Sequence, residues 1–138
     1  MIPGRVFRRT LAGLGAAVAI GCGTRERLTF PTENPGDSKG PTTDIIQPGS
    51  ADTVVVEGDL VFVQGRCTDP DGVDTVYVSV QGLSQSFGPI LGEGQDTVDF
   101  SVSLSTINHG GATAFVQIYG VDVLGDHGSI VSRQIHVE

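Results

Sequence analysis

Basic side chains are scarce in this sequence: eight Lys and Arg residues stand against sixteen Asp and Glu residues, a formal net charge of −8. Three of the eight, Arg5, Arg8 and Arg9, precede Cys22, which leaves five basic and sixteen acidic residues, or −11, in the rest of the chain. An acidic surface of this kind repels phosphate backbones. Nucleic acid is therefore excluded as an expected partner.

The sequence also lacks the signatures of common catalytic and metal sites. Its three histidines match no zinc-binding spacing. Residues 44–138 contain no Gly-x-Ser-x-Gly elbow, and Gly92-x-Gly94 lacks the third glycine of a phosphate-binding loop. We therefore expect no enzymatic activity and no catalytic residues.

The first 21 residues have the three parts of a signal peptide. Arg5, Arg8 and Arg9 supply positive charge, residues 11–20 are apolar or Gly, and small residues precede Cys22. An apolar helix of that length would cover about half of the ~30 Å hydrocarbon core of a bilayer. It is too short to serve as a spanning anchor.

The run Ala19-Ile20-Gly21-Cys22 resembles the processing site of bacterial lipoproteins, with Ala19 where Leu is usual. The resemblance implies that residues 1–21 are a lipoprotein signal peptide and that lipid on Cys22 holds the protein on a membrane outside the cytoplasm. Gly23 stands where many lipoproteins kept at an inner membrane have Asp, which favours the outer membrane or the cell surface. The alternatives are an ordinary cleaved signal and an uncleaved short anchor. Residues 7–11 also partly resemble a twin-arginine export signal.

Residues 22–43 are predicted to form a flexible tether that begins at the lipidated cysteine. They are rich in Pro, Gly, Ser and Thr and have no helical or strand period. About twenty such residues span roughly 25 Å on average. With Cys22 lipidated, Cys67 has no partner for an intramolecular disulfide. A lone cysteine in an apolar strand is expected to be a small core residue.

Residues 44–138 contain several short runs in which polar and apolar side chains alternate. The alternation is strict from Thr97 to Leu104, which is typical of a strand with one buried face. Turn-forming residues separate the runs, and no stretch has a helical period. About seven short strands predict an all-β domain, a single immunoglobulin-like β-sandwich. The expected strands cover 45–47 with 53–56, 59–68, 74–81, 85–90, 96–104, 112–122 and 129–137.

The run VFVQGRCTD at 61–69, followed by Asp71-Gly72-Val73 and Val76-Tyr77-Val78, resembles bacterial immunoglobulin-like (Big-type) domains of surface proteins. The run VDVLG at 121–125 is similar to the motif that closes a later strand of those domains. Antibody-type domains have a cysteine pair and a Trp. This chain has no Trp and no Cys in 112–122, so it is not of that subtype. The resemblance implies a fold more than an activity.

Acidic residues in the turns are the one candidate group for ligand chemistry. In an immunoglobulin-like sandwich, alternate loops gather at one end, which would bring Asp69 and Asp71 near Asp122 and Asp126. Several converging carboxylates suit calcium, which takes six to eight oxygen ligands, so calcium is the candidate cofactor. The alternative is a type I turn with solvated charges, because Asp69-Pro70-Asp71-Gly72 has the residues that such a turn favours.

The expected function is a noncatalytic, membrane-tethered interaction module of the bacterial cell envelope that binds a protein or a glycan. Tyr77 and Phe115 are its candidate binding residues, because both lie opposite the apolar face of their strands. The alternative to a binding role is that these two rings pack against neighbouring strands. The alternative function is a structural accessory subunit of an envelope assembly, stabilised by calcium, whose exposed strand edge joins a partner.

Overall fold

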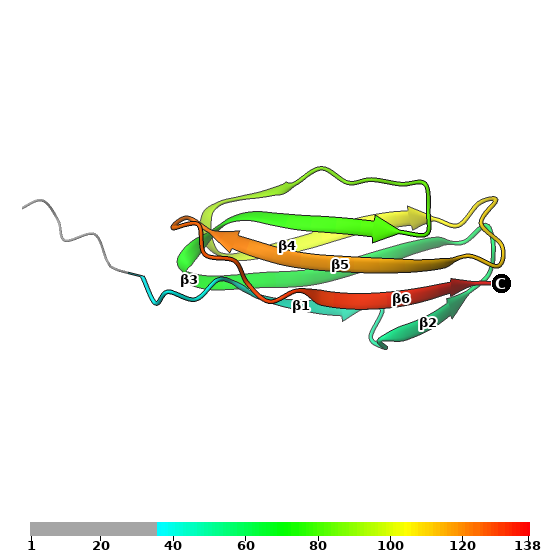
Figure 1. Ribbon diagram of the computed structural model, residues 1–138, viewed down its shortest axis with the longest axis horizontal. Helices are drawn as coiled ribbons and strands as arrows, with labels where there is room; N and C mark the ends of the chain where they lie inside the picture. The colour runs from blue at the N-terminus through cyan, green and yellow to red at the C-terminus, as the bar shows by residue number, and fades with distance from the viewer. Residues whose placement is uncertain (1–35) are drawn as a thin grey trace, which may run out of the picture. The chain divides into compact units, whose positions relative to one another are not determined.

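The computed structural model describes residues 36–138, which form an all-β domain with six strands and no helix (Figure 1). Accordingly, that range offers no helix with the length and hydropathy needed to cross a membrane. The expected signal peptide at 1–21, the lipidation site Cys22 and the tether up to residue 35 lie outside the described residues. The strands are β1 (Thr42–Gln47), β2 (Asp52–Val55), β3 (Leu60–Gln81), β4 (Ile90–Ser105), β5 (Thr113–Asp122) and β6 (Val131–Val137).

The long strand β3 organises the sheet. Its first half, residues 60–68, pairs antiparallel with β1 and with residues 97–105 of β4. Its second half, residues 73–81, pairs antiparallel with β5, and residues 73–76 also pair with residues 90–95 of β4. Strand β5 then pairs with β6, and β6 pairs in parallel with β2. The pairing register shifts between Thr68 and Val73, where β3 turns back on itself (Figure 1). The result is one curled sheet with the strand order β1-β3-β5-β6-β2 and β4 alongside β3.

The number of strands and the division into two sheets are not confirmed. The expected strands at 59–68 and 74–81 are joined into one strand, β3, which bends at Asp69-Pro70-Asp71-Gly72. The expected strand at 85–90 is not formed, since β4 begins at Ile90 and runs through to Ser105. The all-β class and the alternation over 97–104 are confirmed, with each apolar residue of that run buried.

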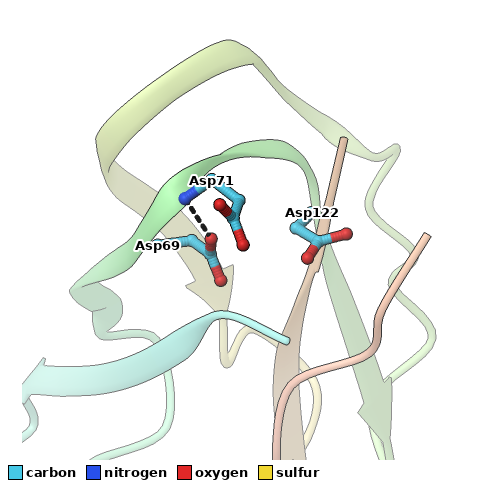
Figure 2. A group of neighbouring side chains, drawn as sticks. All are labelled: Asp69, Asp71 and Asp122. Atoms are coloured by element: carbon cyan, nitrogen blue, oxygen red, sulfur yellow. Dashed lines mark hydrogen bonds between the residues drawn. The ribbon is translucent and has the colours of Figure 1, made fainter. Parts of the chain in front are cut away.

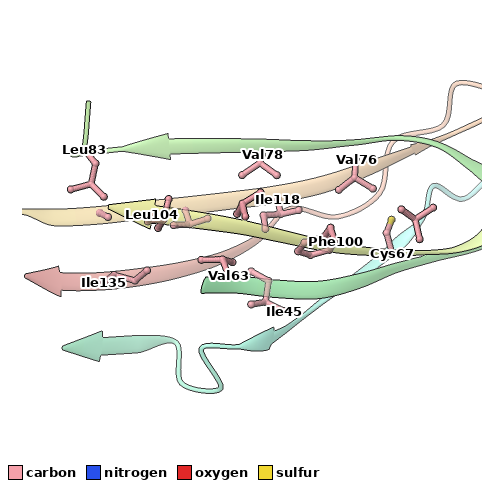
Figure 3. Packing of buried hydrophobic residues seen from close by; sticks show 14 of the residues in the cluster. Ile45, Val63, Cys67, Val76, Val78, Leu83, Phe100, Leu104, Ile118 and Ile135 are labelled. Carbon is pink, nitrogen blue, oxygen red and sulfur yellow. The ribbon is translucent and has the colours of Figure 1, made fainter. Parts of the chain in front are cut away.

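The core fills the inner side of the curled sheet (Figure 3). Residues from every strand except β2 contribute fully buried or nearly buried side chains, and Val55 of β2 packs against them. Cys67 is buried as expected, and its Sγ accepts a hydrogen bond of 3.4 Å from Thr43 Oγ1. Gly65 of β3 pairs with Phe100 of β4, and a Cβ at Gly65 would collide with the Phe100 ring, so this small residue makes room for the large one.

The folded part of the chain begins earlier than the expected boundary at residue 44. Strand β1 starts at Thr42, and Pro41 is fully buried. A Cβ at Gly40 would collide with the backbone of His127 and Gly128, so this segment lies directly against the loop after β5. Residues 36–43, assigned above to the tether, therefore pack on the domain.

Candidate functional site

The bend in β3 positions two of the predicted acidic residues. Asp69 Oδ1 accepts a hydrogen bond of 2.7 Å from the backbone N–H of Asp71, which holds the two carboxylates on the same turn (Figure 2). Gly72 has a φ of 101°, and a Cβ there would lie 2.6 Å from the carbonyl oxygen of Gly94 in β4. Glycine at this position therefore allows both the backbone conformation and the close approach of β4.

The third carboxylate comes from the end of β5. Asp122 Oδ1 accepts hydrogen bonds of 2.8 Å from the backbone N–H groups of both Leu124 and Asp126. These hydrogen bonds fold the loop that follows β5 back onto Asp122, the last residue of that strand. Asp side chains commonly form such bonds in turns. Asp122 Oδ2 is buried and has no hydrogen-bond partner among the described residues.

The three carboxylates form one compact group. One oxygen from each of Asp69, Asp71 and Asp122 lies within 4.8 Å of the other two (Figure 2). Asp69 is 3% exposed and Asp122 2% exposed, while Asp71 is half-buried. Burial raises the pKa of the Asp69 carboxyl, and repulsion from Asp122 and other nearby carboxylates acts in the same direction. These residues could hold a metal ion through carboxylate oxygens alone.

Three of the four predicted calcium ligands are therefore brought together, and the fourth is not. Asp126 contributes its backbone N–H to Asp122 Oδ1, but its carboxylate is not part of the group. The group has an unforeseen neighbour instead: the backbone N–H of Asp37 donates a 2.8 Å hydrogen bond to Asp71 Oδ2. Within residues 36–138 the one ion pair joins Arg66 to Asp99, so no described basic side chain neutralises the three acids.

The predicted binding residues Tyr77 and Phe115 both lie on the outer face of the β3-β5-β6 part of the sheet. Tyr77 is 40% exposed and Phe115 47% exposed. They are not neighbours, because Tyr77 pairs with Tyr119 whereas Phe115 pairs with Gln81. Tyr119 lies four residue steps after Phe115 in β5, which corresponds to about 13 Å along the strand.

Two aromatic residues of this face were missed by sequence reasoning. The rings of Tyr77 and Tyr119 stack with centroids 5.2 Å apart, and the ring of His127 stacks on Tyr119 at 5.8 Å. Tyr119 lies an even number of residues after Phe115 in β5, so the sequence alone could have placed it on the same face. Its pairing with Tyr77 depends on the strand register. For Tyr77, the alternative that its ring packs against a neighbouring strand is thus met in part.

Exposed polar side chains lie between the two aromatic ends of this surface. Ser79 of β3, Gln117 of β5 and Ser132 of β6 face one another across the three strands and are all exposed. We call this surface the aromatic face; it comprises Tyr77, Ser79, Phe115, Gln117, Tyr119, His127 and Ser132.

The described residues define an all-β domain with a buried acidic group at one end and a partly aromatic outer face. No protein-family model and no curated protein sequence matches the chain.

Among solved structures, the chain is similar to the SrpA adhesin from Streptococcus sanguinis, with a TM-score of 0.54 and 16% identity over 75% of this chain and 59% of that one. A mutant of the same adhesin gives a TM-score of 0.51 and 14% identity over 72% of this chain and 57% of that one. A Niemann-Pick type C2 protein from Japanese carpenter ant gives 0.42 and 9% identity over 71% of this chain and 89% of that one. The chain thus spans less than two thirds of the adhesin structures, and the likeness to them is one of fold.

Proposed function

We propose that this chain is a noncatalytic interaction module of the bacterial cell envelope, tethered to a membrane by lipid on Cys22, and that its aromatic face binds a protein or a glycan. The observation that carries the proposal is the pattern of that face: exposed rings at both ends and a row of exposed hydroxyl and amide groups between them. Exposed rings lose unfavourable water contact when a partner covers them, and the polar row supplies directional hydrogen bonds.

The surroundings of Cys67, His109 and His136 support a noncatalytic role. Cys67 is buried, and burial raises the pKa of its thiol, which disfavours the reactive thiolate. His109 is held by two contacts with the backbone, through Nδ1 to Ile107 O and through Nε2 to the N–H of Ser84. The His136 ring bonds Thr113 Oγ1 and Gln134 Nε2. These hydrogen bonds give the imidazole rings of His109 and His136 a structural role.

We also infer that the curled sheet corresponds to an immunoglobulin-like β-sandwich. Both halves of β3 pair with β4, but β1 pairs only with the first half and β5 only with the second, and the inner faces of both halves supply the core. A strand that passes between two layers at a bend is compatible with this architecture. The fold likeness to the adhesin supports the same inference.

The binding proposal is tested with the purified full-length chain on an array of immobilised glycans and envelope proteins. We expect Tyr77→Ala and Phe115→Ala each to weaken capture at least tenfold, a typical loss for an aromatic anchor. The matched control is Phe62→Ala, because Phe62 is also about half exposed but lies on β3 where it pairs with Ser103 of β4, away from the aromatic face. Equal loss in all three variants, or no loss in the first two, would refute the aromatic face as the binding site.

The membrane tether has its own test. In the bacterial host, Cys22→Ala should release the processed protein from the membrane fraction, since lipid on that residue is the proposed anchor. Processed protein that stayed in the membrane fraction would contradict the anchor while leaving the binding face untouched.

A second function is favoured by one observation, the outer edge of β4. Strand β4 pairs with β3 alone. Apart from Ser105, whose backbone N–H and C=O bond the side chain of Gln85, its other edge has no strand partner among the described residues and can accept a strand from a partner. A structural accessory subunit of an envelope assembly would use this edge. Capture that survives both Tyr77→Ala and Phe115→Ala is the result that would favour this function over the first.

A further inference from the structure

The end of the domain near the bend in β3 holds negative charge that the described protein atoms do not balance. Asp69, Asp71 and Asp122 place oxygens within 4.8 Å of one another, and two of the three side chains are almost completely buried. Like charges at this spacing repel, and burial removes the water that would screen them. The group therefore costs folding free energy unless something with positive charge joins it.

A second and independent observation concerns one atom of the group. Asp122 Oδ2 is buried without a hydrogen-bond partner among the described residues, although Oδ1 of the same carboxylate accepts two backbone N–H groups. Buried polar atoms are rarely left unpaired, and an ion is one of the recognised partners. An orphaned carboxylate oxygen beside two further carboxylates has the donor chemistry of a hard cation site.

The group also lies where the chain enters the domain. Asp71 Oδ2 accepts the backbone N–H of Asp37, and Gly36 lies so close to Asp71 and Leu124 that a Cβ there would touch both side chains. A few residues further on, Pro41 is fully buried. Asp71 thus connects the acidic group to the segment before β1.

We propose that Asp69, Asp71 and Asp122 bind one calcium ion, and that the bound ion holds the segment 36–41 against the end of the domain. Calcium neutralises the three carboxylates, gives Asp122 Oδ2 a partner and fixes the position of Asp71. The site shares no residue with the aromatic face, although Gly40 of the held segment lies against the backbone of His127.

The donor set selects the type of ion. Carboxylate oxygens without His or Cys favour calcium or magnesium over zinc and copper. Magnesium requires a nearly ideal octahedron at about 2.0–2.1 Å, whereas calcium accepts six to eight oxygens in irregular arrangements at about 2.3–2.6 Å. Asp69 and Asp71 lie on β3, Asp122 lies on β5, and the half-buried Asp71 carboxylate is open to water. This arrangement suits calcium, the less demanding ion.

The test is thermal unfolding of the purified full-length chain in chelator, in calcium and in magnesium. Extracellular calcium modules bind with dissociation constants of about 0.1 to 1 mM. At about 0.5 mM affinity, calcium at about 5 mM raises the folded-to-unfolded ratio about elevenfold. The melting midpoint should rise by roughly 5 to 10 °C. Magnesium at the same concentration, which controls for general screening of an acidic protein, should produce a clearly smaller rise.

Two variants locate the site and one serves as their control. Asp122→Asn keeps an oxygen for the N–H groups of Leu124 and Asp126 but removes the charge, so the calcium-dependent rise should disappear. Asp71→Asn, at a half-exposed position, should do the same and covers the case in which Asp122→Asn does not fold. Asp126→Asn should keep the full rise, because that carboxylate is outside the group.

Hydrogen exchange tests the effect on the chain entry. The amide hydrogen of Asp37 should exchange more slowly in calcium than in chelator, and the difference should vanish in Asp71→Asn. A melting midpoint that calcium leaves unchanged, an equal effect of magnesium, or a rise that persists in both Asp122→Asn and Asp71→Asn would overturn the calcium site. Unchanged exchange at Asp37 would overturn its role in holding the segment.

Discussion

Replacing Phe100 by Ala should be among the most destabilising single changes in this domain. Phe100 is 5% exposed and belongs to the core cluster. Its ring also occupies the space opposite Gly65 on the neighbouring strand. Because glycine has no side chain, the residue facing Phe100 cannot fill the gap that Ala would leave.

The magnitude follows from the buried area. A phenylalanine side chain buries roughly 150 to 250 Å², which at about 25 cal/mol per Å² corresponds to about 4 to 6 kcal/mol. Residual compactness of the unfolded chain reduces such sums by roughly 10 to 40%. The expected loss of unfolding free energy is about 3 to 5 kcal/mol, the range found for Phe→Ala in protein cores. Single domains have about 5 to 15 kcal/mol in total.

The control is Phe62→Ala, the same substitution on the strand that pairs with the Phe100 segment. Phe62 is 48% exposed, so about half as much area is at stake and no closed cavity forms. We expect a loss of about 1 to 3 kcal/mol, less than for Phe100→Ala. Urea unfolding followed by circular dichroism measures both, because the chain has no Trp to report by fluorescence. Equal losses in the two variants would refute the assignment of inner and outer faces.

Two further predictions concern single ionisable groups. The thiol of Cys67 is buried and its pKa is raised chiefly by that burial, so a neutral-pH thiol reagent should label it only after unfolding in urea; rapid labelling of the native chain would contradict this. Arg66 donates hydrogen bonds to both carboxylate oxygens of Asp99 and lowers the pKa of that carboxyl, so the pair adds stability above the ordinary Asp pKa and loses it as pH falls through the lowered value. In Arg66→Ala the pKa of Asp99, followed by carboxyl NMR, should return toward its ordinary value; no change would show that the pair does not form in solution.

The fold class was predictable because it depends on local pattern. Thr97 to Leu104 alternates strictly, and all its apolar side chains turned out to be buried. A break in the pairing of β3 falls at Asp69-Pro70-Asp71-Gly72, where the sequence predicts a turn. Its form was not foreseen: the segment stays in β3 because the backbone of Gly94 in β4 lies against Gly72, a contact between residues 22 apart.

The acidic group was predictable in part for the same reason. The rule that alternate loops meet at one end predicts that Asp69, Asp71 and Asp122 lie together, as they do in the structure. It failed for Asp126, because proximity of a loop does not determine where a side chain points. The hydrogen bond from the Asp126 N–H to Asp122 Oδ1 decides that, and it turns the backbone of Asp126, not its carboxylate, toward the group.

By itself, the sequence determined the features that depend on the order of residues along the chain. These are the acidic charge, the apolar run before Cys22, the period-two strands and the burial of a lone Cys67. Only the tertiary structure decided which strands pair, in which register, and therefore which distant side chains meet. The Tyr77–Tyr119 stack, the orphaned Asp122 Oδ2 and the bond from Asp37 to Asp71 all arise in this way. The physical reason is that side-chain alternation specifies a face of a strand, whereas contacts across strands depend on register and on the bend in β3.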